Sequence, residues 1–579
     1  MKYILKNIVS HDNIIDTVLN NIGVNNLEKL LKPDSSNDTN PLSVPNMEQG
    51  LELLLKVIKE KGKILILVDS DCDGLTSGAY MWRYLTTAFS DIWVDYYTHS
   101  EKKHGLTKEF MEFLKDKHYD LIIVPDAGTN DVENIEFIEN VYDTRVLIID
   151  HHEIEVVSEY GIIINNQVKL DNVNRNLTGV GMVYLFCKQL DKLIDKNLSS
   201  MFKDLVMIGQ IGDLSNLSEN EVRNICLNSL SHISNPFIET FYNENRKDKL
   251  NNLTFTDLSF GGIIPLINAV TRTGTIEERA LIFEALAGIG ADETFLVTKR
   301  KLNKETRKYE YIDFIMNKYQ YAIEVGNKCK SEQQKLAKKF IDILSSQYNE
   351  ESDIQIYIIP DKSEIKGLTG LMANKMVDKF SKPSIVCWRD NGILRGSLRG
   401  YERILGDFKA WCISTNLFDL VQGHANAAGI ELREDRLDEF IKISKKVEST
   451  GKIHYVDKIY NGFVPMLDIE IISKYEVLWK NGIEKPKFAL ESIDIPKSNI
   501  KWSKNTLRIT KDNITFIKFR TTEEEYKELI NSDLDTVRMN FVGSFEKNIW
   551  NGMTFYQVMV EEYEKFNYMP TVYDFSIFS

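Results

Sequence analysis

The sequence predicts an α/β protein of several domains that ends in a β-barrel. Apolar runs without polar alternation occur at 64–68, 121–124 and 146–149, a pattern typical of strands buried on both faces of a parallel sheet. Amphipathic helical patterns such as 181–195 and 276–287 follow these runs, and the apolar run 354–359 begins a second α/β unit. From about residue 453 onward, short alternating strands predict an all-β region.

Length, composition and charge indicate a multidomain cytoplasmic protein. The 579 residues, 43% of them hydrophobic, are too many for one core and suffice for two or three. A net charge of −14 argues against bulk attraction to nucleic acid, although a locally basic channel is compatible with it. Six cysteines without a C-x-x-C pair suit free thiols in a reducing compartment. Without a signal-peptide core or a bilayer-spanning apolar stretch, we expect no membrane association.

Acidic and imidazole side chains follow each of the three apolar runs. They are Asp69, Asp71 and Asp73, then Asp126, then Asp150, His151 and His152. Because the carboxyl ends of parallel strands share one sheet edge, these groups should converge there. Five carboxylates would repel one another in a cleft unless divalent cations neutralised them, and two ions fit the ligand count better than one. Oxygen and nitrogen ligands without thiolates favour Mn²⁺ or Mg²⁺ over structural zinc.

Two simpler interpretations compete with a catalytic metal site. The D-x-D-x-D-G stretch from Asp69 to Gly74 resembles the opening of an EF-hand loop, but Tyr80 stands where that loop needs a bidentate Glu, and a strand rather than a helix precedes it. Asp126 alone would be read as a turn or helix-cap residue. The repetition at three strand ends favours the metal site.

The motifs resemble those of the DHH phosphoesterase superfamily, and Gly209-Gln210-Ile211-Gly212-Asp213 resembles its fourth motif. Within that superfamily the chain is similar to RecJ-type single-strand-specific exonucleases. The similarity continues through the segments at 40–47, 177–181, 218–223 and 267–272, and the segments at 396–399 and 423–429 resemble the DHHA1 substrate-binding domain. Gln422 in place of a Gly, and Asn-Ala-Val-Thr-Arg at 268–272, depart from the family and indicate a divergent member.

The resemblance implies a role for each candidate residue. Two Mn²⁺ or Mg²⁺ ions would be held by Asp69, Asp71, Asp73, Asp126, His151 and Asp213, with Asp126 bridging them. Asp150 would orient a histidine, and His152 would contact the scissile phosphate or protonate the leaving 3′ oxygen. Substrate would be bound by Asn268, Arg272, Ser397, Arg399, Gly423 and His424, with the Arg399 guanidinium gripping a terminal phosphate. The implied activity is stepwise 5′-to-3′ degradation of single-stranded DNA in repair, recombination or replication.

The domain plan combines composition with the resemblance. We expect a DHH catalytic domain at 1–298, a charged helical connector at 299–349, a DHHA1 domain at 350–450, an oligonucleotide-binding-like barrel at 453–568 and a tail at 569–579. The basic run 299–308 is either a solvated helix face or a track for a phosphate backbone. Trp502, Trp550 and Tyr556 either stack on bases or pack in the barrel. The acidic, aromatic tail either docks single-strand-binding or replication proteins or folds back onto the barrel.

Other functions stay open. A DHH enzyme for short oligoribonucleotides or cyclic dinucleotides would use the same ions but generally lacks the C-terminal barrel. A manganese pyrophosphatase has a different second domain. A non-catalytic replication scaffold would have lost the ligands that this chain retains. The sequence does not distinguish DNA from RNA as substrate.

Overall fold

A computed structural model describes the chain except residues 8–12, 25–26, 37, 101–102, 171, 246–252, 260, 303–306, 361–365, 402–403, 448–452, 480–481, 532–533, 551–552 and 567–579. The chain divides into two compact units. The larger unit consists of Glu28–Leu336 with Lys480–Gly482, and the smaller unit of Met1–Leu27, Ala337–Trp479 and Ile483–Ser579.

A five-stranded sheet in the order β3-β2-β4-β5-β6 forms the centre of the larger unit, and all its described pairings are parallel. The strands are β2 (Lys63–Val68), β3 (Trp93–Thr98), β4 (Leu121–Pro125), β5 (Arg145–Asp150) and β6 (Ile162–Asn165). The three strands predicted from the apolar runs are β2, β4 and β5. They are neighbours in the sheet, so the acids that follow them meet at one edge, as the prediction requires.

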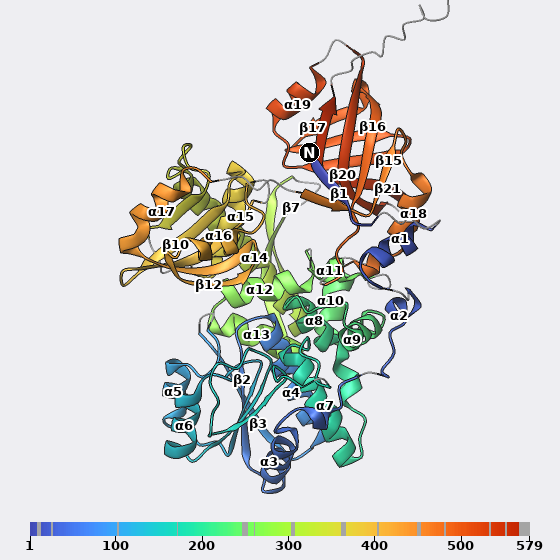
Figure 1. Cartoon of the computed structure of the whole chain (residues 1–579). Coiled ribbons are helices and arrows are strands. Elements are labelled where there is room, and N and C mark those ends of the chain that lie inside the picture. The colour runs from blue at the N-terminus through green and yellow to red at the C-terminus, as the bar shows by residue number, and fades with distance from the viewer. Residues whose placement is uncertain are drawn as a thin grey trace, which may run out of the picture. The chain divides into compact units, whose positions relative to one another are not determined.

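Helices cover both faces of this sheet, which explains why its strands are apolar throughout. Leu65, Ile122 and Ile148 pack with Phe110 and Ile135 from α5 and α6 on one face, and Figure 1 shows these two helices on that side. Helices α4 and α7 pack against the other face. The helices of the larger unit are α2 (Leu27–Leu31), α3 (Met47–Lys59), α4 (Cys72–Ala88), α5 (Lys108–Leu114), α6 (Val132–Val141), α7 (Gly179–Ile194), α8 (Lys203–Gly212), α9 (Asn220–Leu230), α10 (Pro236–Asn245), α11 (Phe255–Ser259), α12 (Ile263–Thr273) and α13 (Ile276–Ala287).

The expected helical connector at 299–349 is helical only in its second part. An antiparallel hairpin of β7 (Thr294–Leu302) and β8 (Tyr309–Asn317) precedes the helix α14 (Lys318–Ser345). The prediction of helix across the basic run was therefore wrong. Lys, Arg and Glu favour helices locally, but Phe295 stacks on Tyr321 of α14, and this packing stabilises the strand.

The smaller unit contains a five-stranded mixed sheet in the order β12-β13-β11-β10-β9. Strand β9 pairs in parallel with β10, and the remaining pairs are antiparallel. Its elements are β9 (Gln355–Ile359), α15 (Thr369–Phe380), β10 (Ser384–Asp390), β11 (Ile393–Arg399), α16 (Phe408–Ser414), β12 (Phe418–His424), β13 (Ala427–Arg433) and α17 (Leu437–Ser444). This is the second α/β region that the run at 354–359 predicts.

The expected C-terminal barrel is an open sheet. Seven strands pair in the order β15-β16-β20-β21-β19-β18-β17, and in the described residues the end strands β15 and β17 do not pair with each other. The predicted hairpin between 507 and 519 is present as β18 and β19, with Asp512 and Asn513 at positive φ in the turn. The elements are β15 (Lys458–Asn461), α18 (Met466–Lys474), β16 (Phe488–Pro496), β17 (Ile500–Ser503), β18 (Thr506–Lys511), β19 (Ile514–Phe519), α19 (Glu523–Ile530), β20 (Thr536–Trp550) and β21 (Met553–Phe566).

The N-terminal 27 residues belong to the smaller unit, although the sequence suggested a first domain of 1–298. Strand β1 (Lys2–Leu5) pairs in parallel with β14 (Ile453–Val456). After α1 (Ile14–Asn21), Asn21 Nδ2 donates to Asp457 Oδ1 at 3.0 Å. A pairing between residues so far apart in the chain leaves no signal in local periodicity.

All six cysteines are free and buried, as expected for a reducing compartment. Among the described helices, none combines the length and apolar character needed to cross a bilayer. The Trp502 indole donates to the Thr521 carbonyl and stacks on Tyr526, so it packs within its own unit. The side chain of Trp550 and the tail at 569–579 lie outside the described residues.

Candidate metal centre

The acids that follow β2 are positioned by the start of α4. Asp71 is the N-cap of this helix, and its Oδ1 accepts a hydrogen bond from Gly74 N at 3.0 Å. Asp73 lies in the first turn, where the positive end of the helix favours a carboxylate. A Cβ on Gly74 would collide with Asp69. The D-x-D-x-D-G pattern is therefore a strand-to-helix turn that directs three carboxylates to one edge.

The N-terminus of α7 binds Asp73. The Asp73 carboxylate accepts hydrogen bonds from Thr178 Oγ1 at 3.0 Å and from the backbone N–H groups of Gly179 and Val180 at 2.8 and 3.2 Å. Gly179 also touches the next acid, because a Cβ there would collide with Asp126 Oδ1. The Leu-Thr-Gly-Val-Gly motif at 177–181 thus supplies donors for one carboxylate and leaves space for another.

His151 faces three carboxylates. Its Nε2 lies 3.2 Å from Asp126 Oδ1 and 3.8 Å from both Asp73 Oδ2 and Asp213 Oδ2. Asp126 follows β4 with φ of 70°, and Asp213 is the C-cap of α8. A Cβ on Gly209 would collide with Asp73 Oδ1, which explains the small residue in the fourth motif. Ligand atoms of Asp73, His151 and Asp213 are close enough to hold one ion.

A second ligand group contains a histidine that the sequence analysis missed. His104 Nδ1 lies 2.5 Å from Asp69 Oδ2, while Gly105 N donates to Asp69 Oδ1 at 3.0 Å. Together with Asp71, these side chains form another group able to hold an ion. His104 sits in a loop after β3, between a lysine and a glycine, and follows no apolar run directly. The available signal was its position after β3, the edge strand of the same parallel sheet.

The electrostatics of the site fit divalent cations. Burial, followed by the charges of Asp73, Asp71, Asp69 and Asp150, raises the pKa of Asp126 well above its usual value. Burial also raises the pKa of Asp69 and of Asp73, and partial burial with the charges of Asp73 and Asp71 raises that of Asp213 to about 7. Asp126 Oδ1 is buried and accepts no hydrogen bond from the described residues. Cations would supply the missing partner and relieve the repulsion.

Asp150 orients His152 rather than His151. Its Oδ1 accepts from the backbone N–H of His151 at 2.7 Å and lies 2.8 Å from His152 Nδ1, and its Oδ2 accepts from Thr129 N at 3.1 Å. Burial opposes ionisation of Asp150, but the contacts with His152 and Thr129 outweigh it and hold the pKa of Asp150 below its usual range. The hydrogen bond to Asp150 raises the pKa of His152 to about 9. Because Nδ1 is engaged, Nε2 is the nitrogen available to a substrate.

Two of the predicted substrate-binding residues lie at this centre. Asn268 and Arg272 from α12 line a small pocket of about 120 Å³ together with Asp71, Asp73 and Asp213. Burial lowers the pKa of Arg272 and the charge of Asp71 opposes this shift, so the guanidinium stays cationic beside the carboxylates. The Arg272 guanidinium thus lies beside the carboxylates of the candidate metal centre.

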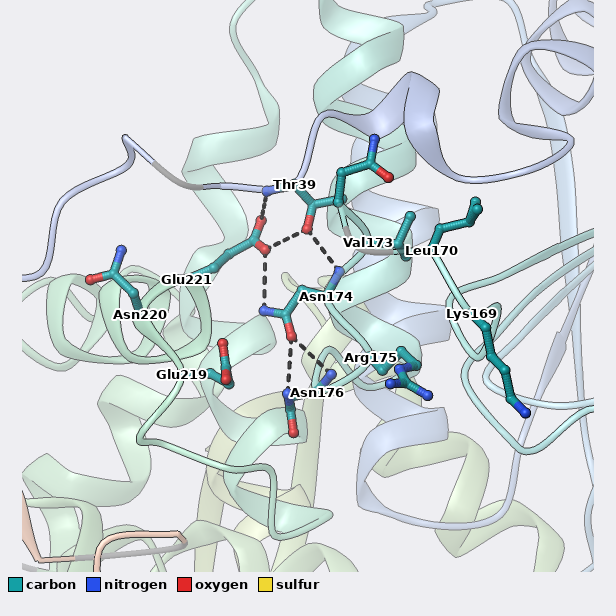
Figure 2. A pocket seen from close by; sticks show the side chains of 11 residues that line it. Thr39, Lys169, Leu170, Val173, Asn174, Arg175, Asn176, Glu219, Asn220 and Glu221 are labelled. Atoms are coloured by element: carbon teal, nitrogen blue, oxygen red, sulfur yellow. Dashed lines mark hydrogen bonds between the residues drawn. The ribbon is translucent and has the colours of Figure 1, made fainter. Parts of the chain in front are cut away.

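A larger cavity of about 680 Å³ is lined by the segment that leads into α7, including Lys169, Arg175 and several asparagines, and by residues 219–221. Figure 2 shows its hydrogen-bond network. Glu221 accepts from Thr39 Oγ1 at 2.7 Å and from Asn174 Nδ2 at 3.3 Å. This network fixes the loop whose last residues, Thr178 and Gly179, bind Asp73. The cavity shares no lining residue with the metal centre, and we assign it a supporting role.

The remaining predicted residues lie in the smaller unit. Ser397 Oγ is 2.8 Å from Thr369 Oγ1, and Arg399 ends strand β11, where its Nη1 donates to the Leu398 carbonyl at 2.7 Å. Gly423 has φ of 133°, and a Cβ there would press against the Ala427 and Ala428 backbone. Arg399 and His424 both lie opposite Ala427 in register, on the strands that flank β13. The structure thus groups these residues in one sheet of the smaller unit. The side chain of His424 lies outside the described residues.

Comparison with known proteins agrees with this geometry. Residues 63–210 match the model of the DHH family, N-terminal domain. The chain is 29% identical over 577 residues to a putative SPbeta prophage-derived single-strand DNA-specific exonuclease, YorK, of Bacillus subtilis, covering 95% of each chain. It is 25% identical over 557 residues to the single-stranded-DNA-specific exonuclease RecJ of Bacillus subtilis, covering 90% of this chain and 64% of that one.

The fold has a solved counterpart. The crystal structure of RecJ from Thermus thermophilus in complex with Mn²⁺ superposes with a TM-score of 0.70 at 16% identity, covering 96% of this chain and 76% of that one. Residues 63–210 thus form a DHH-type domain. The chain as a whole is RecJ-like in fold and similar, at 25–29% identity, to single-strand-specific exonucleases.

Proposed function

We propose that this protein is a two-metal phosphodiesterase that degrades single-stranded DNA stepwise from its 5′ end. The observation that carries the proposal is the buried cluster around Asp126, which needs cations for charge balance and lies beside a pocket that the Arg272 guanidinium lines together with Asp71, Asp73 and Asp213. The relatives that match nearly the whole chain are named as single-strand-specific exonucleases, which supports DNA as the substrate. The polarity rests on the resemblance to RecJ.

Separate residues of the chain would bind the ions, orient the phosphate and donate a proton. Asp73, His151 and Asp213 would hold one ion, and Asp69, Asp71 and His104 the other, with Asp126 between them. Mn²⁺ or Mg²⁺ bound there would lower the pKa of an attacking water and neutralise charge on the phosphoryl group. Arg272 and Asn268 would orient the scissile phosphate. His152, held by Asp150 with its pKa near 9, would carry a proton on Nε2 for the leaving 3′ oxygen.

The smaller unit would select the strand end. Arg399, Ser397 and the Gly423 backbone would grip a 5′-terminal phosphate, since a guanidinium fork matches phosphate oxygens. From the resemblance we also propose a cytoplasmic location, a role in DNA repair, recombination or replication, and docking of single-strand-binding or replication proteins on the C-terminal region. The full set of Asp and His groups speaks against a non-catalytic scaffold.

One assay tests the proposal. Protein stripped by a chelator and reloaded with Mn²⁺ is incubated with single-stranded DNA, single-stranded RNA and a dinucleotide, each labelled at either end. We expect mononucleotide release from the 5′ end of DNA, restored by Mn²⁺ and not by Ca²⁺. Release from the 3′ end would overturn the polarity. Cleavage of the dinucleotide alone would contradict the exonuclease assignment and favour a phosphodiesterase for small substrates.

A further inference from the structure

The hairpin of β7 and β8 has one partly buried and one exposed face. Residues directly opposite in an antiparallel pair share a face. Phe295, Val297 and Lys299 therefore point with Phe314 and Met316 to one side. This side packs on α14, where Phe295 stacks on Tyr321 at 4.3 Å and Lys299 Nζ lies 2.7 Å from Glu324 Oε2.

The opposite side is here called the outer face, and it carries Thr294, Leu296, Thr298, Arg300 and Leu302 of β7 and Tyr309, Tyr311, Asp313, Ile315 and Asn317 of β8. Tyr311 is 75% exposed and Tyr309 is 58% exposed, and the aliphatic side chains of the outer face are also exposed. The Arg300 guanidinium lies over the Tyr309 ring, 4.1 Å from its centroid. Large apolar groups left in water on a separate ribbon indicate a binding surface.

The positive charge of the hairpin indicates an anionic ligand. Residues 294–317 contain six lysines and arginines and three acids, Glu305, Glu310 and Asp313, in a chain whose net charge is −14. A concentrated positive segment on an acidic protein is complementary to a polyanion. Aromatic rings and guanidinium planes interleaved with cations suit unpaired bases joined by phosphates, because bases stack on the rings and phosphates pair with the cations.

We propose that the outer face is a stacking platform for single-stranded DNA, separate from the metal centre. Tyr309 and Tyr311 lie two residues apart on one strand, so both rings face the same side and can receive successive bases. Arg300 orients the first ring and offers its own plane. The platform would hold a part of the strand that is not being cleaved. This inference rests on the proposed function, because it assumes that the substrate is a single strand.

The test measures binding and cleavage by the full-length protein. Binding of a labelled long oligodeoxythymidylate is measured in chelator, across a salt series, for wild type and the Tyr309→Ala/Tyr311→Ala variant. Stacking on each ring predicts a loss of affinity of at least about tenfold for the double variant. Cleavage of a dinucleotide should be unchanged. The Tyr309→Phe/Tyr311→Phe variant should bind as wild type does, since it keeps the rings, and Arg300→Glu should make the salt dependence less steep.

Trp93→Ala is the matched control. Trp93 is also an exposed ring, with Lys63 Nζ 4.6 Å from its centroid, but it begins β3 at the edge of the sheet away from the acids. This variant should keep wild-type affinity. Unchanged affinity of the double Ala variant for the long strand would overturn the platform, as would an equal loss on long and short substrates or a change in oligomeric state. If wild type itself neither binds nor cleaves single strands, the proposed function fails instead.

Discussion

His104 Nδ1 lies 2.5 Å from Asp69 Oδ2, which joins a histidine of the loop after β3 to the first carboxylate after β2. Without a cation, this pair reads as a simple ion pair. With Asp71 close by, the same three side chains make a site of two oxygens and one nitrogen, a donor set that suits Mn²⁺. The contact is therefore compatible both with a salt bridge and with half of a two-metal centre, and a count of bound ions distinguishes the two.

Replacing His104 by Ala should remove one of two bound Mn²⁺ ions. The remaining group of Asp73, His151 and Asp213 does not involve His104, so the other ion should still bind. Titration calorimetry on chelator-stripped protein counts the ions. His118→Ala is the control, because His118 also lies near an acid, Asp120, at 3.8 Å but is largely exposed. A His104→Ala protein that binds as many ions as wild type would show that His104 is only an ion-pair partner.

The sequence predicted the parts of the site that local patterns record. β-branched runs identify buried strands, and an acid after each run identifies the sheet edge, so Asp69, Asp126 and Asp150 could be placed before the structure. His104 could not, because several polar residues separate it from its strand. The hairpin of β7 and β8 was missed because its basic residues favour helix locally, while packing on α14 decides the outcome. The pairing of β1 with β14 depends on residues more than 400 positions apart, and periodicity carries no such information.

Replacing Asp126 by Asn should abolish activity and stabilise the metal-free protein. Asn keeps the shape and tolerates the positive φ of 70°, but it removes a buried charge that faces Asp73, Asp71 and Asp69. We expect a fall in rate of at least about 10³-fold, together with a higher Tm at alkaline pH in chelator. The rise in Tm that Mn²⁺ gives wild type should also shrink. Activity within tenfold of wild type would rule out Asp126 as the bridging ligand.

Acid should destabilise the protein in part through His99. Burial lowers the pKa of His99 from 6.5 to about 4, and the opposing charge of Glu109 does not compensate. The folded state thus binds a proton less readily than the unfolded state. The resulting stability is fully present above pH 6.5 and is lost as the pH falls from 6.5 to 4, by up to about 3 kcal/mol.

The measurement is the free energy of unfolding in chelator between pH 4 and 7 for wild type and for His99→Gln and His99→Phe. Other titrating groups contribute to every curve, so the difference between the curves isolates His99. That difference should be constant near pH 7 and should shift in favour of the variants as the pH falls. A difference that does not vary with pH would mean that His99 titrates normally in the folded protein.

Replacing Arg399 by Ala should remove the preference for phosphorylated 5′ ends. A grip on the terminal phosphate contributes to binding and register rather than to bond breaking, so KM for 5′-phosphorylated strands should rise while kcat changes little. Strands with a 5′ hydroxyl should be used as before. Arg395→Ala is the control on the same strand, because Arg395 is engaged in ion pairs with Asp390 and Glu431 at 3.6 and 3.5 Å. Steady-state cleavage of both substrates by the three proteins decides the matter: if Arg399→Ala keeps the preference of wild type, the phosphate grip belongs to other residues.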